Sequence, residues 1–414
     1  MRKILSAVAI ALVLFTSSVF ADNGQKRLFS AFGQQLVAEE TLVAALHFPY
    51  NINTRHLEGG AVTLTGSGSS SHANSMAELN TTAAINSGAR IASRNVLRYI
   101  NGVGAVVKFT AVFDTCVAGN TQWVGVGDDN DALFFGCNGD TFSVNRRANG
   151  TDNISAQTSW NRRQLSGQDP GTNMVLNPQK GNVYAITYQW LGFGRITFSI
   201  EDQYTGKFEV VHAIDYANTS TTPSLFNPTL PLCIDNQNTT NDTAVTLRVA
   251  SMGAFTQGKH HGVEVTNSHS QTLSATATEA AVFTIQNKST FASITNRVSV
   301  APTLLTLANS GNKDAIFRIV RGTTLGGSPS YSDKDTNTSV VSIDEAGTTL
   351  TGGVDLGDFA VSAGSQIVVN LNALVEEDHV KDVLRPGEIL TVGAAITSAG
   401  TGDVTVGLVW KEQM

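Results

Sequence analysis

Residues 195–200 read Arg-Ile-Thr-Phe-Ser-Ile, and residues 404–410 read Val-Thr-Val-Gly-Leu-Val-Trp. Polar and apolar side chains alternate in both stretches, which is the pattern of a β-strand with one buried face. Val107, Phe109, Ala111 and Phe113 would line one face of a third strand in the same way. Because helical periodicity is scarce and many short strands are separated by turn residues, the sequence predicts an all-β chain of antiparallel β-sandwiches.

The chain is long enough for two domains and is expected to divide near a polar stretch that starts at Gln257. Five parts are predicted, in chain order: a signal peptide over 1–21, an N-terminal segment over 22–45, a large β-sandwich over 46–256, a linker over 257–270 and a smaller C-terminal β-sandwich over 271–414.

The first residues indicate export. Arg2 and Lys3 precede an apolar run over 4–15, and small residues lead to a cleavage site between Ala21 and Asp22. About twelve apolar residues are fewer than the roughly 20 that a membrane span needs, although an uncleaved N-terminal anchor is the alternative. No later stretch of the sequence is long and apolar enough to span, so the mature chain is expected to be secreted or displayed on a surface without a stable membrane span.

The composition argues against nucleic-acid binding. The 414 residues include 27 Lys plus Arg against 34 Asp plus Glu, a formal charge of −7, so there is no basic excess for phosphates. Only 15% of the residues are charged, and the surface must therefore rely on Ser, Thr, Asn and Gly.

The densest polar cluster is Asp128-Asp129-Asn130-Asp131, which lies between two predicted strands. Carboxylate oxygens suit Ca²⁺, so Asp128, Asp129 and Asp131 are candidate metal ligands. The alternative is a solvated hairpin turn, where Asp and Asn serve the backbone geometry. Together with Trp123, whose ring would stack on a sugar if it were exposed, residues 128–131 are the candidate ligand-binding region.

Signatures of catalysis are missing from the sequence. It has no Gly-x-Ser-x-Gly elbow, no His-Glu-x-x-His and no phosphate loop. Glu201 and Asp202 are adjacent, but neighbours on a strand face opposite ways and would not flank one glycosidic bond. No catalytic residue and no cofactor other than Ca²⁺ is therefore predicted.

The three cysteines leave two interpretations open. In an oxidising compartment Cys116 and Cys137 would bridge neighbouring strands, with Cys233 free or paired between chains. Alternatively, all three are buried thiols that pack as small apolar residues.

Several motifs resemble a family of virion structural proteins of tailed phages and large DNA viruses. The motifs are Phe-Pro-Tyr-Asn-Ile-Asn-Thr-Arg at 48–55, Phe-Phe-Gly-Cys-Asn-Gly-Asp-Thr-Phe at 134–142, Gln-Trp-Leu-Gly-Phe-Gly at 189–194 and Asn-Pro-Thr-Leu-Pro at 227–231. The resemblance implies a concanavalin-like or jelly-roll sandwich followed by a smaller sandwich, with no enzymatic activity and with assembly into symmetric oligomers. Cys137 stands where the family pattern would have Tyr, which agrees with an added bridge to Cys116.

The expected function is a non-enzymatic structural or attachment protein of a virion or cell surface, whose polar loops contact glycans or a receptor. Its partners would be further copies of itself, other virion or surface proteins, and glycans. Two alternatives remain: a secreted lectin or carbohydrate-active enzyme of the same fold, and a bacterial envelope adhesin.

Overall fold

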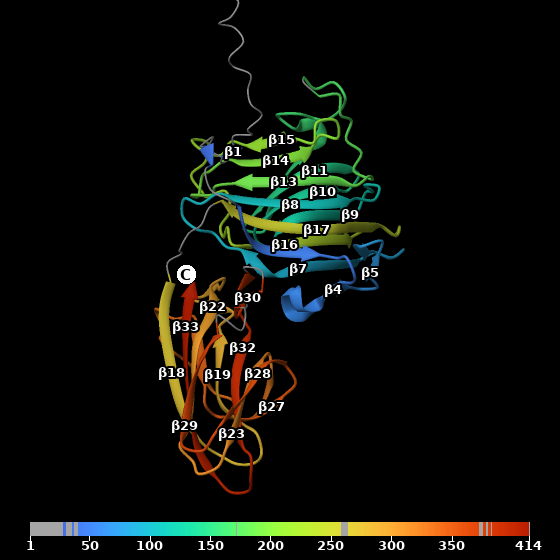
Figure 1. Ribbon diagram of the computed structural model, residues 1–414. Helices are drawn as coiled ribbons and strands as arrows, with labels where there is room; N and C mark the ends of the chain where they lie inside the picture. The colour runs from blue at the N-terminus through green and yellow to red at the C-terminus, as the bar shows by residue number, and fades with distance from the viewer. Residues whose placement is uncertain are drawn as a thin grey trace, which may run out of the picture.

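The computed structural model describes residues 28–29, 35–36, 40–170, 172–257, 264–371, 376–377, 380–381 and 383–413. The predicted signal peptide over 1–21 lies outside these residues. The described part is almost entirely antiparallel β-structure, as the alternation predicts, and forms two sandwiches stacked end to end (Figure 1). Within it, no helix has the length and apolarity of a membrane span.

The N-terminal sandwich consists of a seven-stranded and an eight-stranded sheet. The seven-stranded sheet contains, in spatial order, β12 (Thr151–Ala156), β11 (Thr141–Ala148), β10 (Ala132–Asn138), β9 (Asn120–Gly127), β16 (Leu230–Asn238), β7 (Ser87–Leu97) and β4 (Thr63–Thr65). The eight-stranded sheet contains β15 (Phe208–Ile214), β14 (Ile196–Glu201), β13 (Asn182–Tyr188), β8 (Ala105–Val112), β17 (Thr246–Gln257), β6 (Met76–Asn80) and β5 (Ser69–Ala73), with β3 (Glu40–His47) paired to β17. Short 3-10 turns lie at Thr54–His56, Glu58–Gly60 and Gln157–Ser159.

The core of this sandwich is aromatic. The Phe135 ring from β10 lies 5.0 Å from the Tyr184 ring, 5.3 Å from Phe198 and 6.1 Å from Trp160, measured between centroids. Phe109 faces the same core from β8, as its alternating pattern predicts. Burial of these rings supplies the main driving force for stacking the two sheets.

The C-terminal sandwich has a four-stranded sheet of β18 (Glu264–Ala275), β33 (Gly402–Gln413), β22 (Ser299–Asn309) and β29 (Ser365–Asn370). Its second sheet contains β25 (Tyr331–Asp333), β26 (Val341–Asp344), β19 (Ala280–Asn287), β32 (Ile389–Ile396), β23 (Ala315–Arg321) and β28 (Val354–Val361). Two-stranded pairs are β1 (Leu28–Phe29) with β2 (Gln35–Leu36), β20 (Thr290–Phe291) with β21 (Ile294–Thr295), β24 (Thr324–Gly327) with β27 (Gly347–Thr351), and β30 (Glu376–Glu377) with β31 (Val380–Lys381).

Two predicted boundaries were wrong. Residues 40–47 form β3 and pair with β17, so part of the predicted N-terminal segment 22–45 belongs to the first sandwich. Residues 264–270 belong to β18, so the predicted linker 257–270 extends too far; its residues 258–263 lie outside the described part. β18 alternates exposed and half-buried positions, and its polar sequence therefore reads like a linker although it pairs along its whole length.

Arginines connect the two sandwiches. Arg94 on β7 donates to both carboxylate oxygens of Glu388, over 3.0 and 2.9 Å. Two arginines of the C-terminal sandwich contact the N-terminal one. Arg385 donates to the side-chain oxygen of Asn95 over 2.6 Å, and Arg297 pairs with Asp128 at 2.5 Å. Hydrogen bonds between charged groups are among the stronger ones, so these contacts fix how one sandwich meets the other.

Candidate functional site

In the acidic turn over 128–131, the first and last residues, Asp128 and Asp131, hold other parts of the chain in place. Asp128 Oδ1 accepts the backbone N–H groups of Asn130 (2.8 Å) and Asp131 (2.9 Å), and its Oδ2 pairs with Arg297 of the second sandwich. Asp131 is 1% exposed and accepts the backbone N–H groups of Phe226 (2.8 Å) and Asn227 (3.1 Å). The turn therefore fastens the β15–β16 loop and the second sandwich to the β9–β10 hairpin.

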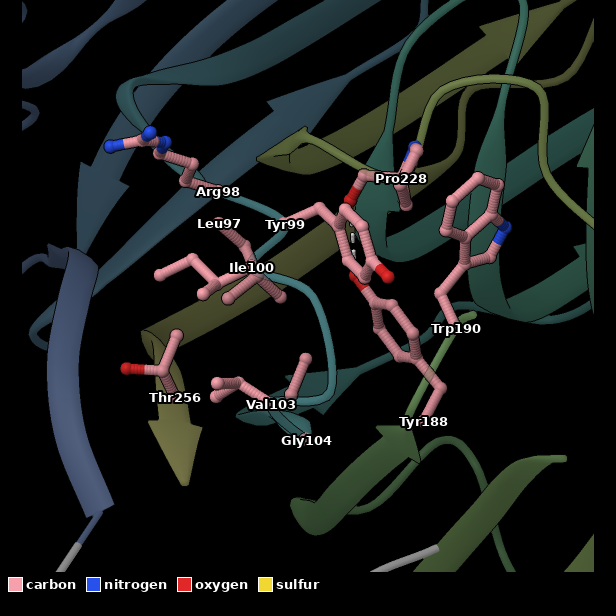
Figure 2. A pocket seen from close by; sticks show the side chains of 11 residues that line it. Leu97, Arg98, Tyr99, Ile100, Val103, Gly104, Tyr188, Trp190, Pro228 and Thr256 are labelled. Carbon is pink, nitrogen blue, oxygen red and sulfur yellow. Dashed lines mark hydrogen bonds between the residues drawn. The ribbon is translucent and has the colours of Figure 1, made fainter. Parts of the chain in front are cut away.

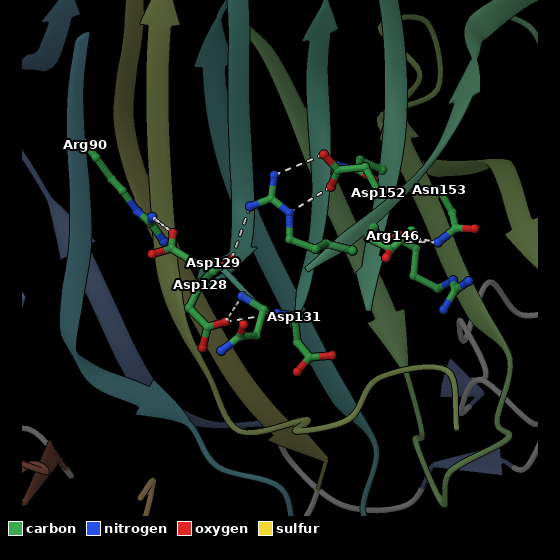
Figure 3. Close-up of polar contacts among 11 residues, drawn as sticks. Arg90, Asp128, Asp129, Asp131, Arg146, Asp152 and Asn153 are labelled. Carbon is green, nitrogen blue, oxygen red and sulfur yellow. Dashed lines mark hydrogen bonds and ion pairs between the residues drawn. The ribbon is translucent and has the colours of Figure 1, made fainter. Parts of the chain in front are cut away.

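The three carboxylates do not converge. Asp129 is turned toward Arg90 on β7, with which it pairs, whereas Asp131 faces the β15–β16 loop (Figure 3). Across the described residues, no group of three His, Cys, Asp or Glu side chains is placed to hold a metal ion. The structure thus does not bring Asp128, Asp129 and Asp131 together as the Ca²⁺ ligands that the sequence suggests. Asn130 is exposed and is held in the same turn through its backbone.

Trp123 is 3% exposed and does not offer its ring to a ligand. Its ring stacks on Phe134 (6.2 Å between centroids, 19° between planes), and together with Ala132 and Cys233 it forms a small cluster apart from the main core. Gly136 stands opposite Trp123 on β10, and a Cβ there would come within 3.0 Å of the indole. The Trp123 ring can lie flat against the sheet because Gly136 has no side chain to occupy that space.

Of the two interpretations of the cysteines, the structure agrees with the bridge. Cys116 and Cys137 form a disulfide with 5.3 Å between their Cα atoms. Cys233 is a buried free thiol, and burial raises its pKa to about 12. A thiol that stays protonated is a poor nucleophile, so Cys233 acts as an apolar residue of the Trp123 cluster.

Of the polar side chains next to that cluster, only Asp129 was singled out from the sequence. They stand on the outer face of the seven-stranded sheet, which we call the arginine face and define as Arg90, Asp129, Arg147, Asp152 and Asp235. Figure 3 labels three of them, Arg90, Asp129 and Asp152. Side chains alternate across a strand, and this face is the one opposite the aromatic core. The register places Asp235 between Arg90 on β7 and Trp123 on β9.

Arg147 and Asp152 form the best-organised pair on the arginine face. Arg147 Nε lies 2.7 Å from Asp152 Oδ1 and its Nη2 lies 3.2 Å from Oδ2, while Asn145 donates to Oδ1 over 2.8 Å. Burial opposes ionisation of Asp152, but the hydrogen bonds from Arg147 and Asn145 outweigh it and hold the pKa of that carboxyl below its usual value. Asp152 is therefore a fixed anion with 36% of its side chain exposed.

Asp235 has the opposite electrostatic environment. Burial raises the pKa of its carboxyl although Arg90 lies beside it, and Gln237 donates to it over 2.9 Å. Asp235 and Asp152 lie on strands four spacings apart in the order β12-β11-β10-β9-β16. At about 4.8 Å per spacing their strands are roughly 19 Å apart, whereas the two carboxyls of glycosidases lie roughly 5–10 Å apart.

The cavity at the edge of the first sandwich is too small for a ligand. Its lining includes Tyr99, Tyr188, Trp190 and Thr256, and it encloses about 10 Å³, which is room for one water molecule (Figure 2). The Tyr99 and Trp190 rings meet edge to face at 4.9 Å beside it. Trp190 therefore lies in the wall of this small cavity and not on a binding surface.

No protein-family model matches the sequence. No curated protein gives a significant match. Solved structures similar to this chain include a glycosyl hydrolase family protein from Mycobacterium fortuitum, with 12% identity over 52% of this chain and 99% of that one and a TM-score of 0.35. A legume lectin-like domain from Entamoeba histolytica has 12% identity over 52% and 98%, with a TM-score of 0.32. A laminarinase from Flavobacterium sp. UMI-01 has 11% identity over 52% and 100%, with a TM-score of 0.35.

Proposed function

We propose that this chain is a non-catalytic glycan-binding protein displayed on a virion or cell surface, and that the arginine face is its contact surface. The observation that carries the proposal is the Arg147–Asp152 pair, which is pre-formed on a rigid sheet and only partly exposed. Guanidinium and carboxylate groups held in this way offer donors and acceptors to neighbouring hydroxyls, which is how a polyhydroxylated ligand is recognised.

The charges on the arginine face favour a neutral glycan. Arg90 and Arg147 are each in a direct ion pair, with Asp129 and Asp152 respectively, and Asp235 is a third carboxyl group on this face. An anionic sugar would have to displace one of these carboxylates, and a cationic one would have to displace an arginine. Uncharged hydroxyls can instead add hydrogen bonds to the pairs as they stand.

Binding without hydrolysis is supported by the separation of Asp235 and Asp152. A glycosidase needs one protonated and one ionised carboxyl flanking the same bond. Burial raises the pKa of Asp235 and hydrogen bonds lower that of Asp152, but the strand order keeps the two apart. The alternative of a carbohydrate-active enzyme rests on Asp235, whose raised pKa would suit a general acid.

A glycan array read together with a reducing-sugar assay tests the proposal. We expect the wild-type chain to bind neutral glycans and to release no reducing ends, and Arg147→Ala to lose the binding. Arg195→Ala is the matched control, because Arg195 pairs with Asp215 next to the other sheet. Turnover that disappears in Asp235→Asn would establish the enzyme, and equal binding by both arginine variants would exclude the arginine face.

The display on a surface is supported by the predicted N-terminal export signal and by the resemblance to virion structural proteins. Immunogold labelling of intact particles or cells from the source would test it. Label on the particle surface is the expected result, and label confined to the cell interior would contradict it.

A further inference from the structure

β18 is an unusually open edge of the second sandwich. It pairs with β33 through twelve consecutive residues, Glu264 to Ala275, without a register shift. On its other side no strand of the described residues pairs with it, and Figure 1 shows it as the outermost strand of its sheet. A long, regular edge of this kind presents a row of unpaired backbone donors and acceptors.

The other outer strands of the four large sheets are protected. Those of six residues or fewer are β4, β5, β12, β25 and β29. The longer ones, β3, β15 and β28, each contain a register shift in their pairing. Short length and bulges are the usual means of preventing edge-to-edge pairing, and β18 has neither.

The side chains of β18 do not prevent pairing either. The strand has no Lys, Arg or Pro, and Glu264 at its first position is already paired with Lys411 of its own sheet at 2.7 Å. Its exposed positions carry small polar side chains, which are Thr266, Ser268, Ser270, Thr272 and Ser274.

We propose that β18 pairs antiparallel with β18 of a second copy of this chain, so that the two four-stranded sheets become one continuous sheet. Residues opposite each other in such a pair lie on the same face of the sheet. Exposed residues must therefore lie opposite exposed residues. A two-fold axis relates the two strands of such a pair, and this condition is met only if the axis passes through a residue and not between two residues.

An axis through His269 matches the side chains on both faces. On the outer face it places Ser268 opposite Ser270, Thr266 opposite Thr272 and Glu264 opposite Ser274. On the inner face it places Val265 opposite Leu273 and Asn267 opposite Gln271. Each pair joins residues of like polarity, and Glu264 faces no second carboxylate. A shift of the axis to Ser270 would instead set Asn267 against Leu273.

Two variants with substitutions at the same positions test both the surface and the register. In Ser268→Lys with Ser270→Lys, each lysine would face a lysine of the partner, and we expect sedimentation velocity to shift from dimer to monomer. In Ser268→Lys with Ser270→Glu, each lysine would face a glutamate, and the dimer is expected to remain. Both positions are exposed, so unfolding curves should show that both variants fold.

Three results would overturn the proposal. The first is a wild-type chain that stays monomeric as its concentration is raised, as it would if another segment of its own chain covered the edge. The second is a dimer that survives in the double-lysine variant. The third is dissociation of both variants, because the register through His269 requires them to differ.

Discussion

Replacing Asp131 by alanine should destabilise the N-terminal sandwich by about 3 kcal/mol. The buried carboxylate accepts two backbone N–H groups, from Phe226 at 2.8 Å and from Asn227 at 3.1 Å. A hydrogen bond to a charged group contributes about 1.5 kcal/mol or more, so the loss of both amounts to about 3 kcal/mol. Asp131→Asn keeps one acceptor oxygen but sets its NH2 group against the other backbone N–H, so it should be destabilising as well.

Urea unfolding followed by tryptophan fluorescence measures this effect, because Trp123, Trp160 and Trp190 lie in the first sandwich and only Trp410 in the second. Asp129→Ala is the control from the same turn. Its carboxylate is 86% exposed in an ion pair with Arg90, so its loss should cost less than about 1 kcal/mol. The reasoning is refuted if the two alanine variants unfold alike, or if Ca²⁺ stabilises the wild type and not Asp131→Ala, since the turn would then hold a metal.

Three further predictions concern the disulfide, a buried histidine and the contact between the sandwiches. Cys116→Ala with Cys137→Ala opens a loop with a sequence separation of 21, and the urea midpoint should fall by an amount equivalent to about 3 kcal/mol; an unchanged midpoint would contradict this. Burial and the nearby Arg162 lower the pKa of His212 below 6.5, so stability should be lost as the pH falls below that value, because the unfolded chain takes up the proton first. His212→Gln should unfold with a flatter pH dependence between pH 7.5 and pH 5, and a slope equal to that of the wild type would exclude this account. Arg94→Ala combined with Arg297→Ala removes two of the ion pairs between the sandwiches, and the radius of gyration from X-ray scattering should increase, whereas an identical scattering curve would show that these pairs do not hold the sandwiches together.

The strands with clear alternation could be predicted from the sequence. Residues 195–200 and 404–410 lie in or overlap β14 and β33, because alternation is a local consequence of which face meets the core. β18 was missed since its inner face is only half-buried, and its residues at those positions include polar ones such as Asn267 and Gln271. An edge strand of this kind has no local signal that separates it from a polar linker.

The sequence draws attention to the hairpin turn at 128–131, but the contacts of that turn depend on distant parts of the chain. The sequence shows four polar residues in a row at 128–131, but not that Asp131 contacts the backbone of a loop 95 positions away or that Asp128 meets Arg297. Alternation does place Asn145 and Arg147 on one face of a strand. It does not say that β12 is the next strand and so brings Asp152 opposite Arg147, since that depends on how the chain turns between them.

A crystal structure of the chain with the neutral glycan that binds most strongly on the array would test the central claim most directly. The account predicts a sugar ring on the arginine face, with its hydroxyls hydrogen-bonded to Arg147 and Asp152 and its glycosidic bonds intact. A glycan bound on the second sandwich, or along the outer face of the eight-stranded sheet, would contradict it.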